Sequence, residues 1–191
     1  ITLLLGRGPT QETGPGGSGT GDQITVKVPE GDYSYWARFK GDKGWVESPR
    51  STGSGPQVTC SLSLVPEGAE AQLVVVREPG PTAAVVALPA KEPATLAQAD
   101  FNYLEWLTVE VRTPWTTRSG RATVRLKDGN GEEMERAAEI EGGEGAVRFP
   151  LVKIGEVTLD ITSDDLGGAY HGKASLLAPD GKPQTHLIRQ M

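Results

Sequence analysis

The chain has little of the residue types that build disulfide frameworks and metal sites. Its 191 residues include one cysteine, Cys60, and two histidines, His171 and His186. A single cysteine excludes an intrachain disulfide and therefore a small disulfide-stapled fold. It also excludes a zinc site of cysteine and histidine ligands, because such a site needs more of them than the chain contains. Within the alternating stretch VTCSLSL, Cys60 is expected to be a small core residue of a strand.

Long apolar runs and basic clusters are also missing. No apolar run reaches the roughly 20 residues that a membrane-spanning helix needs. The apolar pentapeptide at residues 1–5 is too short for the apolar region of a secretory signal, and no basic residue precedes it. Lysine and arginine are spread along a chain whose net charge is −6, which disfavours binding to a phosphate backbone. We therefore expect neither a membrane nor a nucleic acid as a partner.

No stretch spells out a catalytic motif. The G-x-S-x-G elbow of serine hydrolases and the G-x-x-x-x-G-K-[ST] phosphate loop are both absent. Asp160, Asp164 and Asp165 lack the spacing of a calcium loop, so a solvated polar loop is expected there. Glu105 is a lone carboxylate, whereas a glycosidase needs two across a cleft. We predict no catalytic, cofactor-binding or metal-binding residue, and hence a protein that is not an enzyme.

Glycine, proline and short alternating segments dominate instead. The chain holds 25 glycines and 14 prolines, and 37% of its residues are hydrophobic, a composition typical of many short strands joined by turns. Strands are expected at residues 23–28, 33–40, 45–47, 57–64, 71–77, 82–88, 108–112, 121–127, 132–141, 146–151, 156–161, 169–178 and 185–188. Segment 132–141 has a helical composition, but two flanking turns favour an outer strand. Pro150 indicates that its strand lies at a sheet edge.

Composition divides the chain into four parts. Residues 1–22 combine the apolar pentapeptide with a stretch rich in glycine, proline, serine and threonine, which is typical of a flexible arm. Residues 23–90 are expected to form the first β-domain and residues 104–191 the second. The Ala- and Pro-rich residues 91–103 are the expected linker, with room for a short helix. The pentapeptide either docks on its own domain or adds a strand to the sheet edge of a neighbouring subunit.

Two groups of side chains are candidates for interaction surfaces. The first group lies on the apolar arm and on the patch FNYLEWL, and consists of Ile1, Leu3, Leu4, Leu5, Phe101, Tyr103 and Trp106. The second group lies on an aromatic-rich hairpin, where Tyr35, Trp36 and Trp45 could stack on sugar rings. The core is the favoured place for most of these aromatics, because a chain with few hydrophobic residues needs their buried area.

The second half of the chain carries turns in a recognisable order. An Asp-Gly hairpin turn starts at Asp128, a strand begins with Gly145, a stretch L-G-G-x-Y-x-G spans residues 166–172, and Asp-Gly-Lys follows at residues 180–182. This order resembles the immunoglobulin-like module of tailed-phage virion proteins, such as the N-terminal domain of baseplate upper proteins, over about residues 108–191. The resemblance implies an immunoglobulin-like β-sandwich, a structural role in a virion and no catalysis.

The same motif suggests how one strand is locked. Tyr170 would lie across the end of the sandwich and bond the backbone through its hydroxyl, as in a tyrosine corner. Gly172 would relieve crowding within that strand. The chain departs from the pattern at residues 152–161, where a further strand-like segment precedes the loop.

The sequence therefore predicts an all-β protein of two small immunoglobulin-like sandwich or barrel domains with a flexible N-terminal arm. We expect a non-enzymatic structural protein of a bacteriophage virion, acting as a capsid decoration or other minor component. Its expected partners are other virion proteins or copies of itself in a symmetric assembly. The alternatives are a glycan-binding or adhesion module on a virion or a bacterial surface, a tail or baseplate component, and an accessory domain of a larger enzyme.

Overall fold

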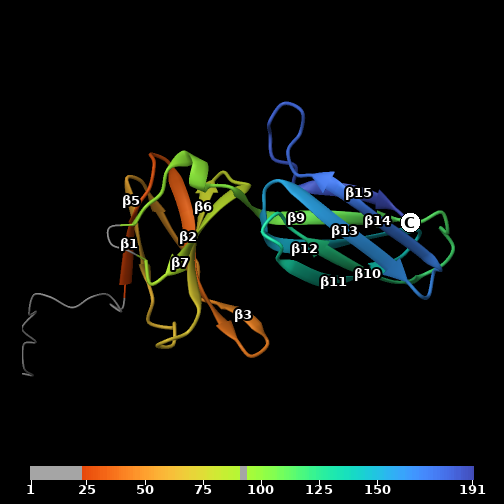
Figure 1. The fold of residues 1–191 in the computed structure, drawn as a ribbon, viewed down its shortest axis with the longest axis horizontal. Helices are drawn as coiled ribbons and strands as arrows, with labels where there is room; N and C mark the ends of the chain where they lie inside the picture. The colour runs from red at the N-terminus through yellow and green to blue at the C-terminus, as the bar shows by residue number, and fades with distance from the viewer. Residues whose placement is uncertain (1–22, 91–93) are drawn as a thin grey trace, which may run out of the picture.

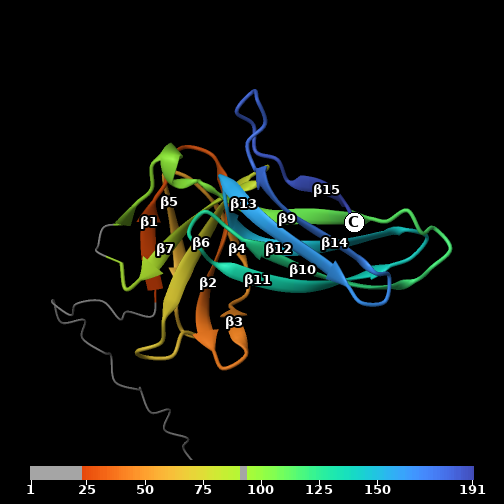
Figure 2. The same cartoon turned by 45° about the vertical axis from the view of Figure 1, so that its right-hand side comes forward.

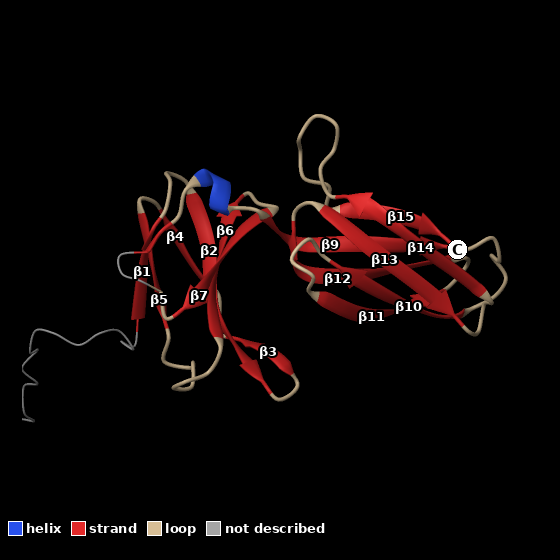
Figure 3. Ribbon diagram, in the orientation of Figure 1, coloured by secondary structure: helices blue, strands red, loops and turns tan. Residues whose placement is uncertain are grey.

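The computed structural model describes residues 23–90 and 94–191. The predicted arm, residues 1–22, lies outside the described residues, and so do the candidates Ile1, Leu3, Leu4 and Leu5. The described part consists of β-strands and one short 3-10 helix, arranged as two β-sandwiches that follow each other along the molecule (Figures 1 and 3). The predicted all-β fold class is confirmed.

The first sandwich consists of a small three-stranded sheet and of most of an eight-stranded sheet, whose remaining strands belong to the second sandwich. Its elements are β1 (Gln23–Lys27), β2 (Asp32–Gly41), β3 (Gly44–Glu47), β4 (Ser51–Ser54), β5 (Gln57–Ser61), β6 (Ala71–Glu78), β7 (Thr82–Leu88), β8 (Ala94–Thr95) and η1 (Gln98–Asp100). The small sheet has the order β5-β1-β8, and the facing sheet runs β7-β6-β2, with β3 and β4 both paired to the outer edge of β2.

The core of the first sandwich lies between these two sheets. Alternation places Ile24 and Val26 of β1 on one inner face, and Val58 and Cys60 of β5 continue it. The opposite wall is formed by side chains of the larger sheet, namely Tyr33, Tyr35, Ala37, Leu73, Val75 and Ala84. Cys60 is therefore the buried core residue that its alternating stretch predicts.

The second sandwich has seven strands divided three and four. They are β9 (Tyr103–Arg112), β10 (Gly120–Lys127), β11 (Glu133–Ile140), β12 (Glu144–Lys153), β13 (Glu156–Ser163), β14 (Gly168–Ser175) and β15 (His186–Gln190). One sheet has the order β11-β10-β13-β14, and the other places β9 between β12 and β15. β15 runs parallel to β9, whereas the other pairs of this sandwich are antiparallel. Alternation in β10, in β13 and in β9 from Leu107 onward buries Val109, Val124 and Leu159 in a common apolar core.

A shared sheet joins the two sandwiches. β7 pairs with the first residues of β9, with Thr82 opposite Leu104 and Ala83 opposite Tyr103. The larger sheet of the first sandwich therefore continues, through a sharp change of direction, into the three-stranded sheet of the second. The backbone amide of Glu105 reinforces this seam by donating a hydrogen bond of 2.8 Å to the carbonyl of Pro81.

Leu151, whose backbone is left-handed, fills the space beside this seam. The register of β12 on β9 is unbroken there, since Pro150 pairs with Trp106 and Val152 with Leu104, which leaves Glu105 opposite Leu151. Its backbone adopts a φ of 48°, a left-handed conformation that leucine rarely takes. This conformation interrupts the alternation of β12, so Leu151 packs into a cluster with Trp36, Val74, Val76 and Ala83, while the next residue, Val152, faces the core of its own sandwich. Two successive residues of β12 are thus buried in two different clusters.

Most predicted strands are confirmed, including the outer strand β11 and the edge position of β12. Two assignments are wrong. Residues 51–54 form the edge strand β4, although they were expected to be a loop, because a strand of serine, threonine and glycine shows no apolar alternation. Residues 94–101, expected to be part of the linker, complete the first sandwich, since β8 pairs with β1 while Leu96 and Phe101 are buried in its core.

The predicted role of Gly172 agrees with the packing, whereas the tyrosine corner does not form. The Tyr170 ring folds over Gly172, where an added Cβ would lie 2.4 Å from the tyrosine Oη. The guanidinium carbon of Arg189 on β15 lies 5.7 Å from the centre of that ring. Within the described residues, the Tyr170 hydroxyl makes no hydrogen bond to the backbone. Tyr170 instead closes the side of the sandwich between β14 and β15.

Candidate interaction surfaces

The outward face of the four-stranded sheet is covered by paired charges. Acidic and basic columns alternate across the strands, with ion pairs Arg121–Glu139, Arg125–Glu135, Lys127–Glu133, His171–Asp160 and Lys173–Glu156. Between β10, β11 and β13 the face has a shallow hollow of about 320 Å³, which these charged side chains line. Because the pairs are largely exposed, water screens them and each contributes little to stability. This face is suited to contact with water.

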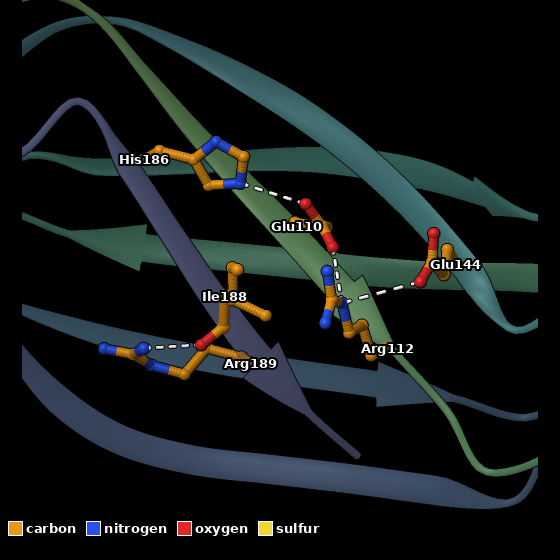
Figure 4. A network of polar contacts seen from close by, with 6 residues as sticks. All are labelled: Glu110, Arg112, Glu144, His186, Ile188 and Arg189. Atoms are coloured by element: carbon orange, nitrogen blue, oxygen red, sulfur yellow. Dashed lines mark hydrogen bonds and ion pairs between the residues drawn. The ribbon is translucent and has the colours of Figure 1, made fainter.

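The outward face of the three-stranded sheet is organised around Glu110. The Glu110 carboxylate accepts a hydrogen bond of 2.5 Å from Arg112 Nε, and its second oxygen lies 3.0 Å from His186 Nε2 (Figure 4). Arg112 also lies 3.6 Å from Glu144 on the neighbouring strand. The hydrogen bond from Arg112 is the main reason why the pKa of Glu110 is lowered. The reciprocal contact raises the pKa of Arg112, so both groups are charged at neutral pH.

Exposed apolar side chains share this face with the charges. Trp106 on β9 is 39% exposed and Ile188 on β15 is 47% exposed. In the sheet register, Ile188 lies beside Glu110, and Trp106 lies beside Pro150 two rows away. The combination of exposed apolar groups and a polar cluster distinguishes this face from the charged face of the other sheet.

The three predicted interface residues of the patch FNYLEWL lie in different environments in the structure. Phe101 is buried in the first sandwich, where its ring lies 5.7 Å from that of Tyr33, so it cannot form an external contact. Tyr103 packs at the seam, where its hydroxyl accepts a hydrogen bond from Asn130 Nδ2 and Lys153 stacks on its ring. Trp106 keeps an exposed ring and remains available to a partner.

The proposed sugar-stacking aromatics are mostly interior. Tyr35 and Trp36 are 7% and 1% exposed, because β2 is covered on one face by the small sheet and on the other by the second sandwich. These two rings therefore cannot stack on a sugar at the surface, and their assignment as glycan-facing residues is wrong. Trp45 on β3 is partly exposed, but Arg38 lies over its ring at 4.2 Å.

Two arginines lie against the tryptophan rings of this region. Arg50 lies 3.8 Å over the Trp36 ring and pairs with Glu105 across the seam at 2.5 Å. Arg38 is buried and is held by Gln72, which accepts two of its hydrogen bonds. Burial lowers the pKa of Arg38, although the negative charges of Glu132 and Glu47 act in the opposite direction. The Arg50–Glu105 pair joins the two sandwiches, and both arginines hold a tryptophan ring in place.

Among residues 23–90 and 94–191, no three His, Cys, Asp or Glu side chains are placed to hold a metal ion. No helix in this part of the chain has the length and apolarity to cross a bilayer.

The Glu110 cluster was not anticipated from the sequence, because its members come from β9, β12 and β15. The sequence does contain a signal for some members of this cluster. The stretches TVEVR and HLIRQ both alternate, which marks Glu110, Arg112, His186 and Ile188 as outward residues. Placing them side by side requires the parallel register of β15 on β9, which alternation does not reveal.

Comparisons with known proteins identify no family for the chain. No protein-family model matches it, and no curated protein matches it. Among solved structures, a candidate adhesin from Bacteroides ovatus ATCC 8483 aligns over 87% of this chain and 92% of its own, with 9% identity and a TM-score of 0.29. A pullulanase from Anoxybacillus sp. LM18-11 in complex with maltotriose aligns over 86% of this chain and 27% of its own, with 13% identity and a TM-score of 0.27.

Proposed function

We propose that the chain is a non-enzymatic structural module of a virion, a capsid decoration or other minor component, that acts through protein–protein interfaces. The observation that carries the proposal is the seam between the sandwiches. A continuous sheet, the buried Leu151 and the Arg50–Glu105 pair hold them in one orientation. A stiff two-domain body suits a protein that must present surfaces at a fixed spacing.

The setting in a virion rests on the order of turns in the second sandwich. The Asp-Gly turn at Asp128, the glycines around Tyr170 and the Asp-Gly-Lys turn at residues 180–182 resemble the phage immunoglobulin-like module. Its partners would be other virion proteins or further copies of the chain in a symmetric array.

Adhesion at a bacterial surface is the second candidate. It is favoured by Trp106, whose exposed ring lies on a flat sheet face diagonally from Arg148. An aromatic ring and a cation at this separation could contact an acidic sugar. In this role the stiff body would hold the binding face away from the cell. A tail or baseplate component is a further setting for the same architecture.

Fractionation of the producing culture distinguishes these settings. An antibody against the recombinant chain should label nuclease-resistant particles that sediment with capsid protein, and immunogold microscopy should then show whether the label lies on capsids or tails. Label on intact cells without particles would favour adhesion, and a glycan array would then be the next measurement. A chain found only as a free cytoplasmic monomer would contradict both candidates.

A further inference from the structure

The two outward faces of the second sandwich differ in what they expose. The face of the four-stranded sheet pairs its charges internally, and the large exposed apolar residues of the described chain lie elsewhere. The face of the three-stranded sheet exposes Trp106 and Ile188. Exposed apolar residues surrounded by polar ones mark interaction sites, so the three-stranded face is where a partner is to be sought.

The register of the three strands arranges this face in rows. One row contains Arg148, Thr108 and His186; the next contains Ala146, Glu110 and Ile188; and the next contains Glu144, Arg112 and Gln190. On β12 the outward order is therefore acid, small residue, base. Glu144 and Arg148 lie at equal distances on either side of Ala146.

Not every charge on this face has a partner among the described residues. Glu110 and Arg112 are paired at 2.5 Å, and His186 contacts the same carboxylate. Glu144 is 64% exposed and has only the longer contact of 3.6 Å with Arg112. Arg148 is exposed and has no hydrogen bond or ion pair within residues 23–90 and 94–191. The face thus offers a free cation and a weakly held anion on one strand.

A second copy of the chain satisfies both charges. We propose that this face docks on the same face of another copy, about a two-fold axis that lies between the sheets and crosses the strands at the row of Ala146. Such an axis places β12 antiparallel to the partner's β12, so that Arg148 of each copy meets Glu144 of the other. Ile188 then packs against its own symmetry mate, as in an isologous interface. Glu110 also approaches its mate, and the Arg112 contact compensates that repulsion.

The area of the face sets the strength of this contact. Three strands about 4.8 Å apart and four rows about 6.8 Å apart cover roughly 14 by 27 Å, or about 380 Å² per copy. A stable interface buries about 800 Å² on each partner. The dimer is therefore weak in dilute solution and becomes effective when many copies are held close together. The inference rests on the proposed assembly role and names one contact within it.

Charge reversal and charge exchange test the proposal. The full chain is studied by sedimentation equilibrium from about 10 to 1,000 µM at low ionic strength, where charged contacts are least screened. Arg148→Glu and Glu144→Arg are each expected to weaken association at least fivefold, because each places like charges together. The double variant, which exchanges the two charges, should restore association to within about twofold of the wild type. Ile188→Ser should weaken it without rescue by either charge variant.

Controls separate this contact from other causes of association or misfolding. Arg121→Glu makes the same change of charge on the opposite face and should leave association unchanged. Circular dichroism melts verify that every variant is folded. A chain that stays monomeric at all concentrations, association that survives Arg148→Glu, or a double variant that is not rescued would overturn the proposal. So would a monomer whose glycan binding depends on Trp106. None of these results would alter the particle location that tests the proposed function.

Discussion

Replacing Leu151 by alanine and by glycine tests how the two sandwiches are joined. The Leu151 side chain is 3% exposed and fills the cluster beside the seam. Truncation of such a leucine to alanine costs about 2–5 kcal/mol of unfolding free energy, because contacts are lost and a cavity remains. Alanine also keeps the strain of a left-handed backbone, which is about 1–2 kcal/mol for a residue with a Cβ.

Glycine at position 151 separates the two contributions. It loses the same contacts as alanine, but a φ of 48° costs it nothing, so Leu151→Gly should be more stable than Leu151→Ala by about 1 kcal/mol. Val152 is the matched control, since it is equally buried and its φ is not in the positive range. At an ordinary strand position glycine is the worse choice, and Val152→Gly should be less stable than Val152→Ala by about 0.5–1 kcal/mol.

Urea denaturation followed by tryptophan fluorescence measures both differences, and Trp36 reports directly on the cluster that Leu151 fills. The opposite sign at the two neighbouring positions is the expected result. If glycine is also worse than alanine at position 151, the left-handed backbone at this residue is refuted. If Leu151→Ala costs less than about 1 kcal/mol, the side chain does not hold the sandwiches together.

Three further predictions concern single groups. Because the hydrogen bond from Arg112 lowers the pKa of Glu110, the stabilisation by this carboxylate is present above the ordinary glutamate pKa and is lost as the pH falls through the lowered value. The difference in unfolding free energy between the wild type and Glu110→Gln should therefore shrink between pH 7 and pH 3, and a constant difference would contradict this. Gly172→Ala should cost about 1–3 kcal/mol, because its Cβ would lie 2.4 Å from the Tyr170 Oη, and the further change Tyr170→Ser should recover most of the loss if that contact is the cause. Burial raises the pKa of the Cys60 thiol, which is 3% exposed, so a thiol reagent should label it slowly in the folded chain and completely in urea; rapid labelling of the folded chain would show that this core opens.

Much of the strand pattern could be predicted, because alternation is a local property. β1 and β7 were located to within a residue, and β11 was recognised between its two turns despite a helical composition. β4 was missed because an edge strand that buries no large side chain needs no apolar residue. The left-handed residue Leu151 was also missed, since the apolar run FPLV gives no sign of it and only the neighbouring sandwich explains why both Leu151 and Val152 are buried.

The candidate surfaces depended on information that the sequence does not contain. Trp36 lies on the opposite face of β2 from Tyr35, and both rings were candidates for an exposed glycan-facing surface. Both faces are buried, because a second domain covers the side that a single sandwich would leave exposed. Trp106, a predicted interface candidate, has an exposed ring, but the row of Arg148, Thr108 and His186 beside it depends on registers between distant strands.

The parallel pairing of β15 with β9 has a mechanical consequence. Both views place β1 and residue 191 toward opposite ends of the molecule (Figures 1 and 2). A pull along the long axis draws β9 toward the first sandwich and β15 the other way, so the two strands slide past each other. The five pairs from His186–Thr108 to Gln190–Arg112 then bear the load together and do not open one at a time. The second sandwich is thus built to resist tension along its length.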